Sequence, residues 1–376
     1  MRWTAWCVAA GVLVLVVAPG AAASHGPEAH LPMRDRGSRV DTPRSCRGVL
    51  FVTVERSRPV LWYLRAPGTS PKRVAQLGAG TEVNAAAVAP GGRMVALELE
   101  VPRGGSTAAM ALFSRRRGSL GTARLLIAEL RPRGRPSFVA RLSGSSPSWS
   151  RDGRRLALQR GAAVLVTSSV AWSKAEFVTW GRDPAWSPAG NRLAFARDSL
   201  FGSSIFVATI EGTTRLTDGT RYDREPVWSP RGARILFARS KRAAGWEDLW
   251  IVPARGGPAR RLTHYNRYNG ARSPLWSAEG RHVAFTMANS EAWGARVLRV
   301  RNAKVSVPRH PARARGGLAF TRPGAWQSER AFYYEVGMTR RSLWLHMSRR
   351  RPVQVLERRP SLRVLDTGLC GEAPRR

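Results

Sequence analysis

Acidic residues and cysteines are scarce in this chain. Its 376 residues include 25 Asp or Glu against 62 Lys or Arg, which leaves a formal net charge of +37, and only three cysteines. A basic excess of this size predicts a strongly positive surface that attracts polyanions. A solvated basic surface with no dedicated ligand is the simpler alternative.

Motifs of catalysis and metal binding are absent from the sequence as well. No serine lies in a Gly-x-Ser-x-Gly nucleophile elbow, and the six histidines form neither His-Glu-x-x-His nor a zinc-binding spacing with cysteine. No Gly-x-x-x-x-Gly-Lys loop is present that could hold a phosphate. We therefore predict no catalytic residue, no bound metal and no cofactor.

Long apolar runs are also missing, except at the N-terminus. Met1 to Ala23 has one basic residue, an apolar run that ends at Pro19-Gly20, and then three alanines. This pattern is typical of a secretory signal peptide with an Ala-x-Ala cleavage site, whereas a membrane anchor would need about 20 unbroken apolar residues. We expect residues 1–23 to be removed and the mature protein to be secreted, outside the cytoplasm. Residues 24–45 are polar and predict a flexible lead-in, and residues 46–376 would form a single domain.

A short motif recurs along the rest of the chain. Pro184-Ala185-Trp186-Ser187-Pro188 leads to Gly190 and then to Leu193-Ala194-Phe195, so that Gly follows Trp by four residues and an apolar residue follows it by nine. Ser-Pro-x-Gly supplies the fixed φ and the positive φ of a tight reversal, so each copy predicts a β-hairpin. The other copies surround Trp149, Trp228 and Trp276, with two altered copies at Val88, which replaces Trp, and at Trp326, after which Arg330 replaces Gly.

The spacing of the copies favours one fold. Successive Trp residues are about four short strands apart, which is the size of one propeller blade and too long for one coil of a β-helix. We predict an all-β propeller of four-stranded blades, in which the repeated Trp residues pack between blades rather than bind sugar. These predicted structural anchors are Trp149, Trp186, Trp228, Trp276 and Trp326.

The number of blades leaves two alternatives. The second, third and fourth strands of each blade form seven sets, which begin near residues 48, 93, 154, 191, 233, 281 and 330. Only six innermost strands precede such a set, because none precedes the first. Leu362 to Leu365 has strand character and could supply the missing inner strand. We prefer seven blades, closed by strand exchange between the termini, to six blades with a spare hairpin, because an unpaired edge exposes backbone donors and acceptors.

The repeated motif strongly resembles the WD-like repeat of the TolB-type propeller family, over nearly all of the chain after residue 45. Arg215-Leu216-Thr217 and Arg261-Leu262-Thr263 resemble the Leu-Thr segments of the same family. The resemblance implies a protein-interaction scaffold of the cell envelope that uses its loop-bearing face and central channel. TolB itself carries a mixed α/β domain before its propeller, so the short lead-in here makes a Tol–Pal role doubtful. Similar repeats form the regulatory propeller of prolyl-oligopeptidase-type peptidases, and without a hydrolase domain we expect no peptidase activity.

Three functions from different classes stay open. The first is a non-enzymatic scaffold, which we expect to be a monomer that binds an envelope protein or peptide. The second is a binder of an anionic envelope polymer or a lipid surface, with nucleic acid the least expected polyanion. The third is a propeller enzyme whose acid and base would come from Asp152, Asp183 or Glu225. Asp183 and Glu225 share one position of the motif, which favours a structural hydrogen-bonding role.

Several residues outside the motif are candidates for binding or for closure. Trp246 and Trp293 break the Trp pattern and are predicted in loops between second and third strands. Signal cleavage would leave Cys46 and Cys370 near the two ends of the domain, where we predict a disulfide in an oxidising compartment. Clusters of Arg in a long insertion, in loops or in outer strands are candidate anion-binding residues: Arg115, Arg116, Arg117, Arg340, Arg341, Arg349, Arg350 and Arg351.

Overall fold

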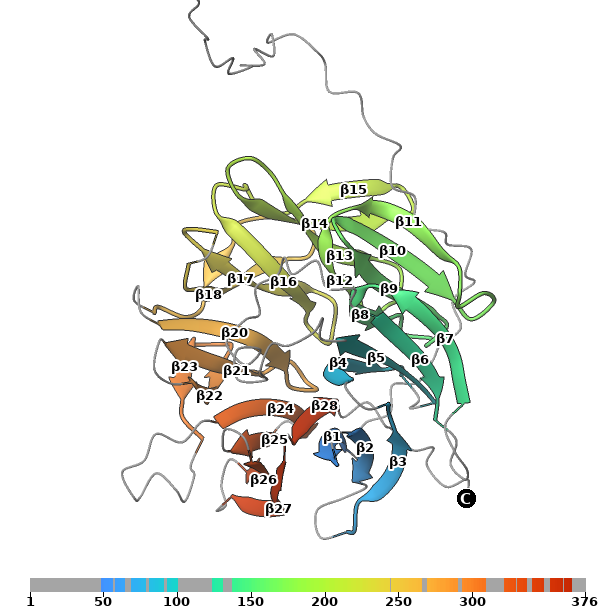
Figure 1. Cartoon of the computed structure of the whole chain (residues 1–376). Coiled ribbons are helices and arrows are strands. Elements are labelled where there is room, and N and C mark those ends of the chain that lie inside the picture. Colours follow the sequence, from blue (N-terminus) through green and yellow to red (C-terminus); the bar gives the residue numbers. More distant parts are fainter. Residues whose placement is uncertain are drawn as a thin grey trace, which may run out of the picture.

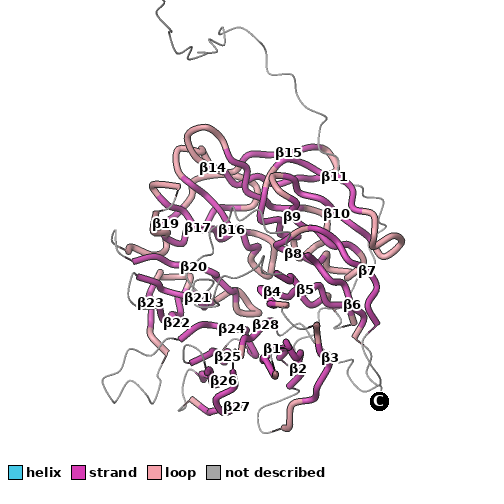
Figure 2. Tube along the Cα trace, viewed as in Figure 1, coloured by secondary structure: helices cyan, strands magenta, loops and turns pink. Residues whose placement is uncertain are grey.

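The computed structural model is built from β-strands, with no helix among the residues that it describes (Figures 1 and 2). The described residues are 49–366, apart from 57, 65–68, 79–80, 91–92, 101–123, 131–136, 244, 266–268, 290–292, 309–320, 329, 337–339, 348–351 and 361. The all-β prediction is therefore confirmed for this part of the chain. No segment of it forms a helix long and apolar enough to cross a membrane.

The strands assemble into four-stranded antiparallel blades that follow one another along the chain. The blades β12–β15 and β16–β19 belong to one continuous sheet because a single parallel pairing, Ser203 with Tyr222, joins them. In chain order the strands are β1 (Val49–Glu55), β2 (Arg58–Leu64), β3 (Lys72–Gln76); β4 (Glu82–Val88), β5 (Met94–Glu100), β6 (Arg124–Glu129), β7 (Ser137–Ser143); β8 (Ser145–Trp149), β9 (Arg155–Arg160), β10 (Ala163–Ser168), β11 (Ala175–Trp180); β12 (Arg182–Trp186), β13 (Leu193–Asp198), β14 (Ser203–Thr209), β15 (Gly212–Arg215); β16 (Tyr222–Trp228), β17 (Arg234–Ser240), β18 (Asp248–Pro253), β19 (Arg260–Arg261); β20 (Asn269–Trp276), β21 (His282–Asn289), β22 (Trp293–Arg299), β23 (Lys304–Ser306); β24 (Thr321–Ser328), β25 (Ala331–Val336), β26 (Arg340–Met347), β27 (Val353–Pro360); and β28 (Arg363–Asp366).

The two ends of the described chain meet in one sheet. β28 pairs antiparallel with β1, so the strand order of this blade is β28-β1-β2-β3, and Leu50 lies opposite Asp366. Figure 1 shows the last strands, drawn in red, beside the first strands, drawn in blue. The innermost strand of the first blade is thus supplied from the far end of the sequence.

The predicted hairpins around Trp149, Trp186, Trp228 and Trp276 are present, and these four share one local geometry. In the hairpin of Trp186, the Ser187 N–H donates to the Arg192 carbonyl at 2.8 Å and the Gly190 N–H donates to the Ser187 carbonyl at 2.8 Å. Gly190 has φ +72°, a conformation that suits glycine because it has no Cβ. The Ser187 hydroxyl also accepts from the Arg192 N–H at 3.1 Å, which explains why Ser recurs after Trp.

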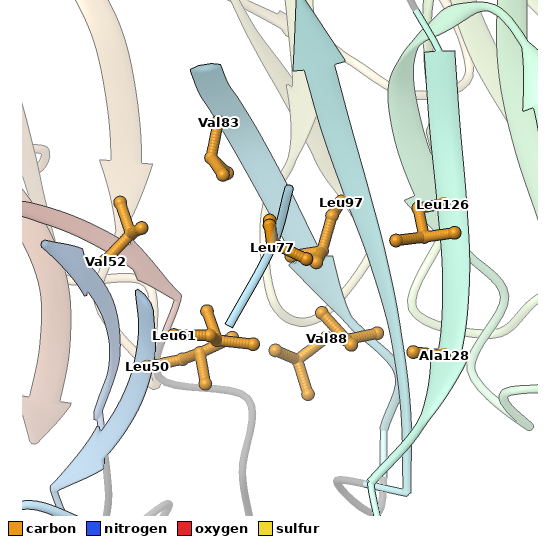
Figure 3. Close-up of a cluster of buried hydrophobic side chains, with 10 residues drawn as sticks. Leu50, Val52, Leu61, Leu77, Val83, Val88, Leu97, Leu126 and Ala128 are labelled. Carbon is orange, nitrogen blue, oxygen red and sulfur yellow. The ribbon is translucent and has the colours of Figure 1, made fainter. Parts of the chain in front are cut away.

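The hydrophobic core lies between neighbouring blades. One buried cluster joins Leu50 and Leu61 of the first blade to Val88, Leu97 and Leu126 of the next, and Figure 3 shows these side chains pointing toward one another from the two sheets. Similar clusters of buried aliphatic and aromatic side chains join the following blades. Each blade therefore depends on the next one for burial of its faces, which is the arrangement of a β-propeller.

One local prediction needs correction. Trp293 is the first residue of β22 rather than part of a loop, because Ala288 and Trp293 already pair across the β21–β22 hairpin. β22 is followed by a short outer strand, β23, which pairs with it through Val305. Three residues of strand are too few to give a periodic pattern that sequence analysis could detect.

Candidate functional site

The five repeated Trp residues lie between blades. Trp149, Trp186 and Trp228 are buried, and Trp276 and Trp326 are half-buried. In four of them the indole N–H donates to the carbonyl that precedes the anchor residue of the preceding blade, while Trp186 Nε1 finds no acceptor in the described structure. The four acceptors are Ala87 for Trp149 (2.8 Å), Ala185 for Trp228 (2.9 Å), Val227 for Trp276 (3.3 Å) and Leu275 for Trp326 (2.9 Å).

An arginine covers the ring of two anchors, Trp186 and Trp228. The Arg155 guanidinium lies 4.8 Å from the ring centroid of Trp186, and Arg192 lies 4.7 Å from that of Trp228. Both also donate to a carbonyl of the next turn, that of Gly190 at 2.9 Å and that of Gly232 at 3.1 Å. The anchor rings are therefore packed by protein groups, and a stacked sugar would have to displace them.

Sequence analysis missed this use of arginine. It read the basic excess as a surface property, whereas Arg155 and Arg192 hold one blade to the next. The available signal was positional, because a basic residue recurs six residues after Trp at Arg155, Arg192, Arg234 and His282. The His282 ring stacks on Trp326 with centroids 6.3 Å apart.

A strained backbone position recurs three residues before Trp. Ser146, Asp183, Glu225 and Ser273 have φ between +50° and +55°, a region that residues with a side chain seldom occupy. At each of these positions the inner strand carries a register shift. Each of their N–H groups donates to a side chain of the preceding blade: Glu98 at 2.8 Å, Gln159 at 3.2 Å, Asp183 at 3.2 Å and Glu225 at 3.4 Å, in chain order.

The three acidic residues considered for catalysis have structural partners. Asp183 and Glu225 accept the backbone hydrogen bonds just described, each from the next blade. Asp152 accepts from the Ser150 hydroxyl at 2.5 Å and from the Arg154 N–H at 3.0 Å. Burial opposes ionisation of Asp152, but these hydrogen bonds and the charges of Arg155 and Arg154 hold its pKa below the usual value. The arrangement stabilises turns and blade contacts rather than forming an acid–base pair.

Two buried carboxylates of the β16–β19 blade form ion pairs with arginines. Asp223 is fully buried and binds Arg239 with two hydrogen bonds of 2.6 and 2.8 Å. Glu247 is also buried and pairs with Arg224 at 3.3 Å and with Arg272 at 2.8 Å. Asp223 therefore offsets the charge of Arg239, whereas the single carboxylate of Glu247 is shared by two arginines, of which Arg272 is 42% exposed.

Trp246 is half-buried beside this network. The Arg272 guanidinium lies 5.6 Å from its ring centroid, and the backbone of Gly270 packs against the same ring. Arg272 and Gly270 therefore cover part of the Trp246 ring that a binding role would need. For Trp293 the structure describes only the backbone.

The candidate anion-binding arginines are not brought together in the part of the chain that is described. Arg340 and Arg341 begin β26, where only their backbone positions are given. The remaining candidates, Arg115, Arg116, Arg117, Arg349, Arg350 and Arg351, lie outside the described residues, as do Cys46 and Cys370. Within residues 49–366, as far as described, no group of three His, Cys, Asp or Glu side chains could hold a metal ion.

Comparison with known proteins gives a family and a fold. The model of the TolB beta propeller domain matches residues 138–307, which confirms the resemblance seen in the repeated motif. No curated protein sequence matches the chain. A putative TolB from Agrobacterium tumefaciens is 19% identical, with 69% of this chain and 88% of that chain covered and a TM-score of 0.48.

Two peptidase structures superpose over more of the chain. A structure of prolyl endopeptidases is 12% identical, with a TM-score of 0.60, and covers 86% of this chain and 50% of that chain. Prolyl oligopeptidase B from Galerina marginata is 9% identical, with a TM-score of 0.55, 86% of this chain and 53% of that chain. The chain thus spans about half the length of these peptidases, and at such low identity the likeness shows the propeller fold alone.

Proposed function

Because residues 138–307 match the model of the TolB beta propeller domain, we propose that this protein is a non-enzymatic scaffold that binds a protein or peptide in the cell envelope. One observation supports this proposal above all. The carboxylates of Asp183 and Glu225, the best placed for acid–base chemistry at the inner strands, accept backbone hydrogen bonds from the next blade. Since these two carboxylates hold neighbouring blades together, we infer that the surface of the assembled blades serves to bind a partner.

We also propose that the scaffold is a single ring of seven blades formed by residues 46–376. Contacts between inner strands support this number, because β4 contacts β8 and the series continues through β12, β16, β20 and β24 to β28, which in turn contacts β4. The pairing of β28 with β1 supports closure by strand exchange. A closed ring leaves no blade face without a neighbour.

The proposed setting of this scaffold is outside the cytoplasm. The support is the N-terminal sequence, in which residues 1–23 have the pattern of a cleaved secretory signal and residues 24–45 that of a flexible lead-in. N-terminal sequencing of the protein recovered from the extracytoplasmic fraction of its source tests this. A mature N-terminus close to residue 24 is the expected result, and an intact Met1 in the cytoplasmic fraction would contradict it.

A second candidate function is binding of an anionic envelope polymer or an anionic lipid surface. The net charge of +37 favours it, since exposed charge attracts polyanions over about a Debye length of 10 Å at 0.1 M salt and 3 Å at 1 M. Part of this charge is used inside the fold, as the Asp223–Arg239 pair illustrates. For this reason we rank the polyanion below a protein or peptide partner.

One experiment separates the two candidates. The purified mature protein, immobilised on beads, is exposed to an envelope extract at 0.1 M and at 1 M salt, and bound material is analysed for protein, lipid and polymer. A specific protein retained at 1 M salt supports the scaffold. Binding that disappears at 1 M salt supports the polyanion, and the absence of any specific partner at either salt concentration contradicts both.

A further inference from the structure

The turns that follow the Trp anchors lie at one end of the blades and touch one another. A Cβ placed on Gly190, in the β12–β13 turn, would lie 3.6 Å from the Arg151 Cβ of the β8–β9 turn. A Cβ on Gly232, in the β16–β17 turn, would lie 3.6 Å from the Pro188 Cδ, and the β20–β21 turn packs on the β16–β17 turn in the same way. Side chains on these four turns therefore share one continuous surface, which we call the turn face.

The middle of the turn face has arginines and no acidic residue. Three of its connections, residues 187–192, 229–234 and 254–259, contain neither Asp nor Glu. The third of them joins β18 to β19 and lies beside the second, because the Ala254 N–H donates to the Ala233 carbonyl at 3.0 Å. Together they carry four arginines, none of which forms an ion pair with a described carboxylate: Arg192, Arg231, Arg234 and Arg255.

Two of these arginines lie close enough to repel each other. Arg192 is held over the Trp228 ring, and it donates to the Gly232 carbonyl at 3.1 Å. Burial lowers the pKa of Arg192, and the positive charge of Arg255 lowers it further. Like charges that no carboxylate offsets disfavour each other, and an anion bound between them would remove that cost.

Acidic residues of the neighbouring connections do little to offset this charge. Asp152 is engaged by hydrogen bonds within its own turn, and Glu279 pairs with the arginine two residues later at 3.0 Å. Glu211, in the β14–β15 turn, is exposed and forms no ion pair with a described residue. At the opposite end of the β16–β19 blade, by contrast, arginines pair with the buried Asp223 and Glu247. The unpaired arginines of this blade are thus gathered on the turn face.

We propose that the turn face binds a linear anionic polymer, whose charged oxygen atoms contact Arg192, Arg231 and Arg255. This inference rests on the second candidate function and names its ligand class and its binding surface. An exposed arginine gains little from one isolated anion. A polymer contacts several arginines at once and releases condensed counterions when it binds, so the weak contacts add.

The test uses the full mature chain with two polymers, polyphosphate and hyaluronate, which carry phosphate and carboxylate groups. The double variant Arg231→Gln/Arg255→Gln removes two exposed charges from the turn face and leaves Arg192 on Trp228. The double variant Arg221→Gln/Arg242→Gln is the matched control. It removes the same charge from exposed positions at the opposite end of the blade, where Tyr222 pairs with Ser240. Equal unfolding midpoints of the two variants and the parent confirm that all three proteins are folded.

We expect the turn-face variant to bind polyphosphate or hyaluronate about fivefold or more weakly than the parent at 0.1 M salt. The slope of log K against log salt should become shallower by about 1. The control variant should lose no more than about twofold, since only the general field of the protein changes. The polymer that shows this pattern identifies the oxyanion as phosphate or carboxylate. Equal losses in the two variants, with either polymer, would mean that the charge acts diffusely and would overturn the site.

A second measurement locates the polymer directly. Phenylglyoxal modifies accessible arginines, and mass spectrometry of the modified protein shows which of them the polymer protects. We expect protection of Arg231 and Arg255 and none of Arg221 and Arg242. Protection of the second pair instead of the first would overturn the proposal.

The outcomes separate this inference from the function on which it rests. If the parent binds a polymer and the turn-face variant binds it unchanged, the second candidate function stands and the turn face is wrong. If the parent binds neither polymer at 0.1 M salt, both the inference and polymer binding fail. Binding of the parent to phosphatidylglycerol vesicles, with no binding of either polymer, would assign the positive charge to a lipid surface and overturn the proposal.

Discussion

At the scale of single residues, arginine and tryptophan act together. The indole of Trp228 donates to the Ala185 carbonyl of the preceding blade, and Arg192 of that blade lies over its ring. A buried aromatic ring, a hydrogen bond and a cation thus meet at one blade contact. The repeated Trp is consequently a packing residue whose removal should affect the fold before it affects binding.

We predict that Trp228→Ala lowers the free energy of unfolding by about 3–5 kcal/mol, as truncation of a buried aromatic side chain does. Urea unfolding followed by fluorescence measures the change. Trp180→Ala is the control, because Trp180 is 64% exposed and its loss should cost far less. A Trp228 variant that keeps the parent's stability but loses its partner would mean that this Trp is a binding residue.

The Asp152 carboxylate should make the stability of its turn depend on pH. The hydrogen bonds and nearby arginines hold its pKa in the folded protein below the ordinary value, although burial opposes this, so its contribution to stability is fully present above about pH 4. This contribution is lost as the pH falls through the lower, folded pKa. We predict that Asp152→Asn is less stable than the parent at pH 6 and that the difference shrinks below pH 3. Urea midpoints of both proteins from pH 6 to pH 2 test this, and parallel curves would contradict it.

At the scale of the structural element, the inner strands use a strained bulge at each blade contact. Ser146 holds φ +53° while its N–H donates to Glu98 of the preceding blade. The left-handed region costs roughly 1 kcal/mol or more for a residue with a Cβ, and the contact must outweigh that cost. The strain therefore belongs to the packing of blades and not to a catalytic centre.

Replacing Ser146 by Gly tests this directly. We predict that Ser146→Gly is at least as stable as the parent, with a gain of up to about 1 kcal/mol, because glycine occupies this region freely. Ser145→Gly, one residue earlier in β8, should instead lose about 0.5–1 kcal/mol, since glycine weakens an ordinary strand position. Thermal and urea unfolding give both values. The same loss in both variants would argue that the Ser146 side chain itself is required.

Local chemistry explains how much of these elements the sequence could predict. The hairpin at Trp186 was predictable because Ser187 and Gly190 close its turn with hydrogen bonds to residues of the same motif. The bulge at Glu225 was not, because its stabilising partner, Asp183, is supplied by another blade. The exposure of Trp180 was equally hidden, since an aromatic residue in a strand is normally read as buried.

At the scale of the whole molecule, charge and closure are the two properties that no single blade determines. The net charge of +37 is spread over residues that play different roles, from Arg239, which pairs with the buried Asp223, to arginines in the insertion between β5 and β6. The electrostatic contribution to binding is therefore best tested where arginine is dispensable for the fold. We expect Arg115, Arg116 and Arg117 to meet this condition because they lie beyond the repeated motif.

We predict that replacing these three arginines by Ser leaves the unfolding midpoint nearly unchanged. If the anionic partner exists, the variant should bind anionic vesicles or polymer more weakly and with a shallower dependence on salt. Co-sedimentation from 0.05 to 0.5 M salt measures both effects. A variant that sediments like the parent throughout this range would exclude these three arginines from binding.

Closure of the proposed ring would depend on the pairing of β28 with β1. The register of this pairing bears on the two cysteines. Leu50 lies opposite Asp366, so Cys46 is four residues before the one and Cys370 is four residues after the other. In an antiparallel ladder that continued with this register, positions 46 and 370 would be directly opposed. Opposed residues in such a ladder are about 4.5–5.5 Å apart at Cα, a separation that a disulfide spans.

We therefore predict a Cys46–Cys370 disulfide in the secreted protein, which would link covalently the one blade that is assembled from both ends of the chain. The disulfide would enclose nearly the whole mature chain. Loop-closure entropy predicts that it stabilises the folded state by about 5 kcal/mol. Tryptic digestion without reduction should yield Ser45–Arg47 joined to Val364–Arg375, and reduction should separate the two peptides and lower the thermal midpoint. Cys46→Ser should reproduce that loss of stability without further change on reduction. Two free thiols in protein taken from its native compartment would show that backbone pairing alone holds the ends together.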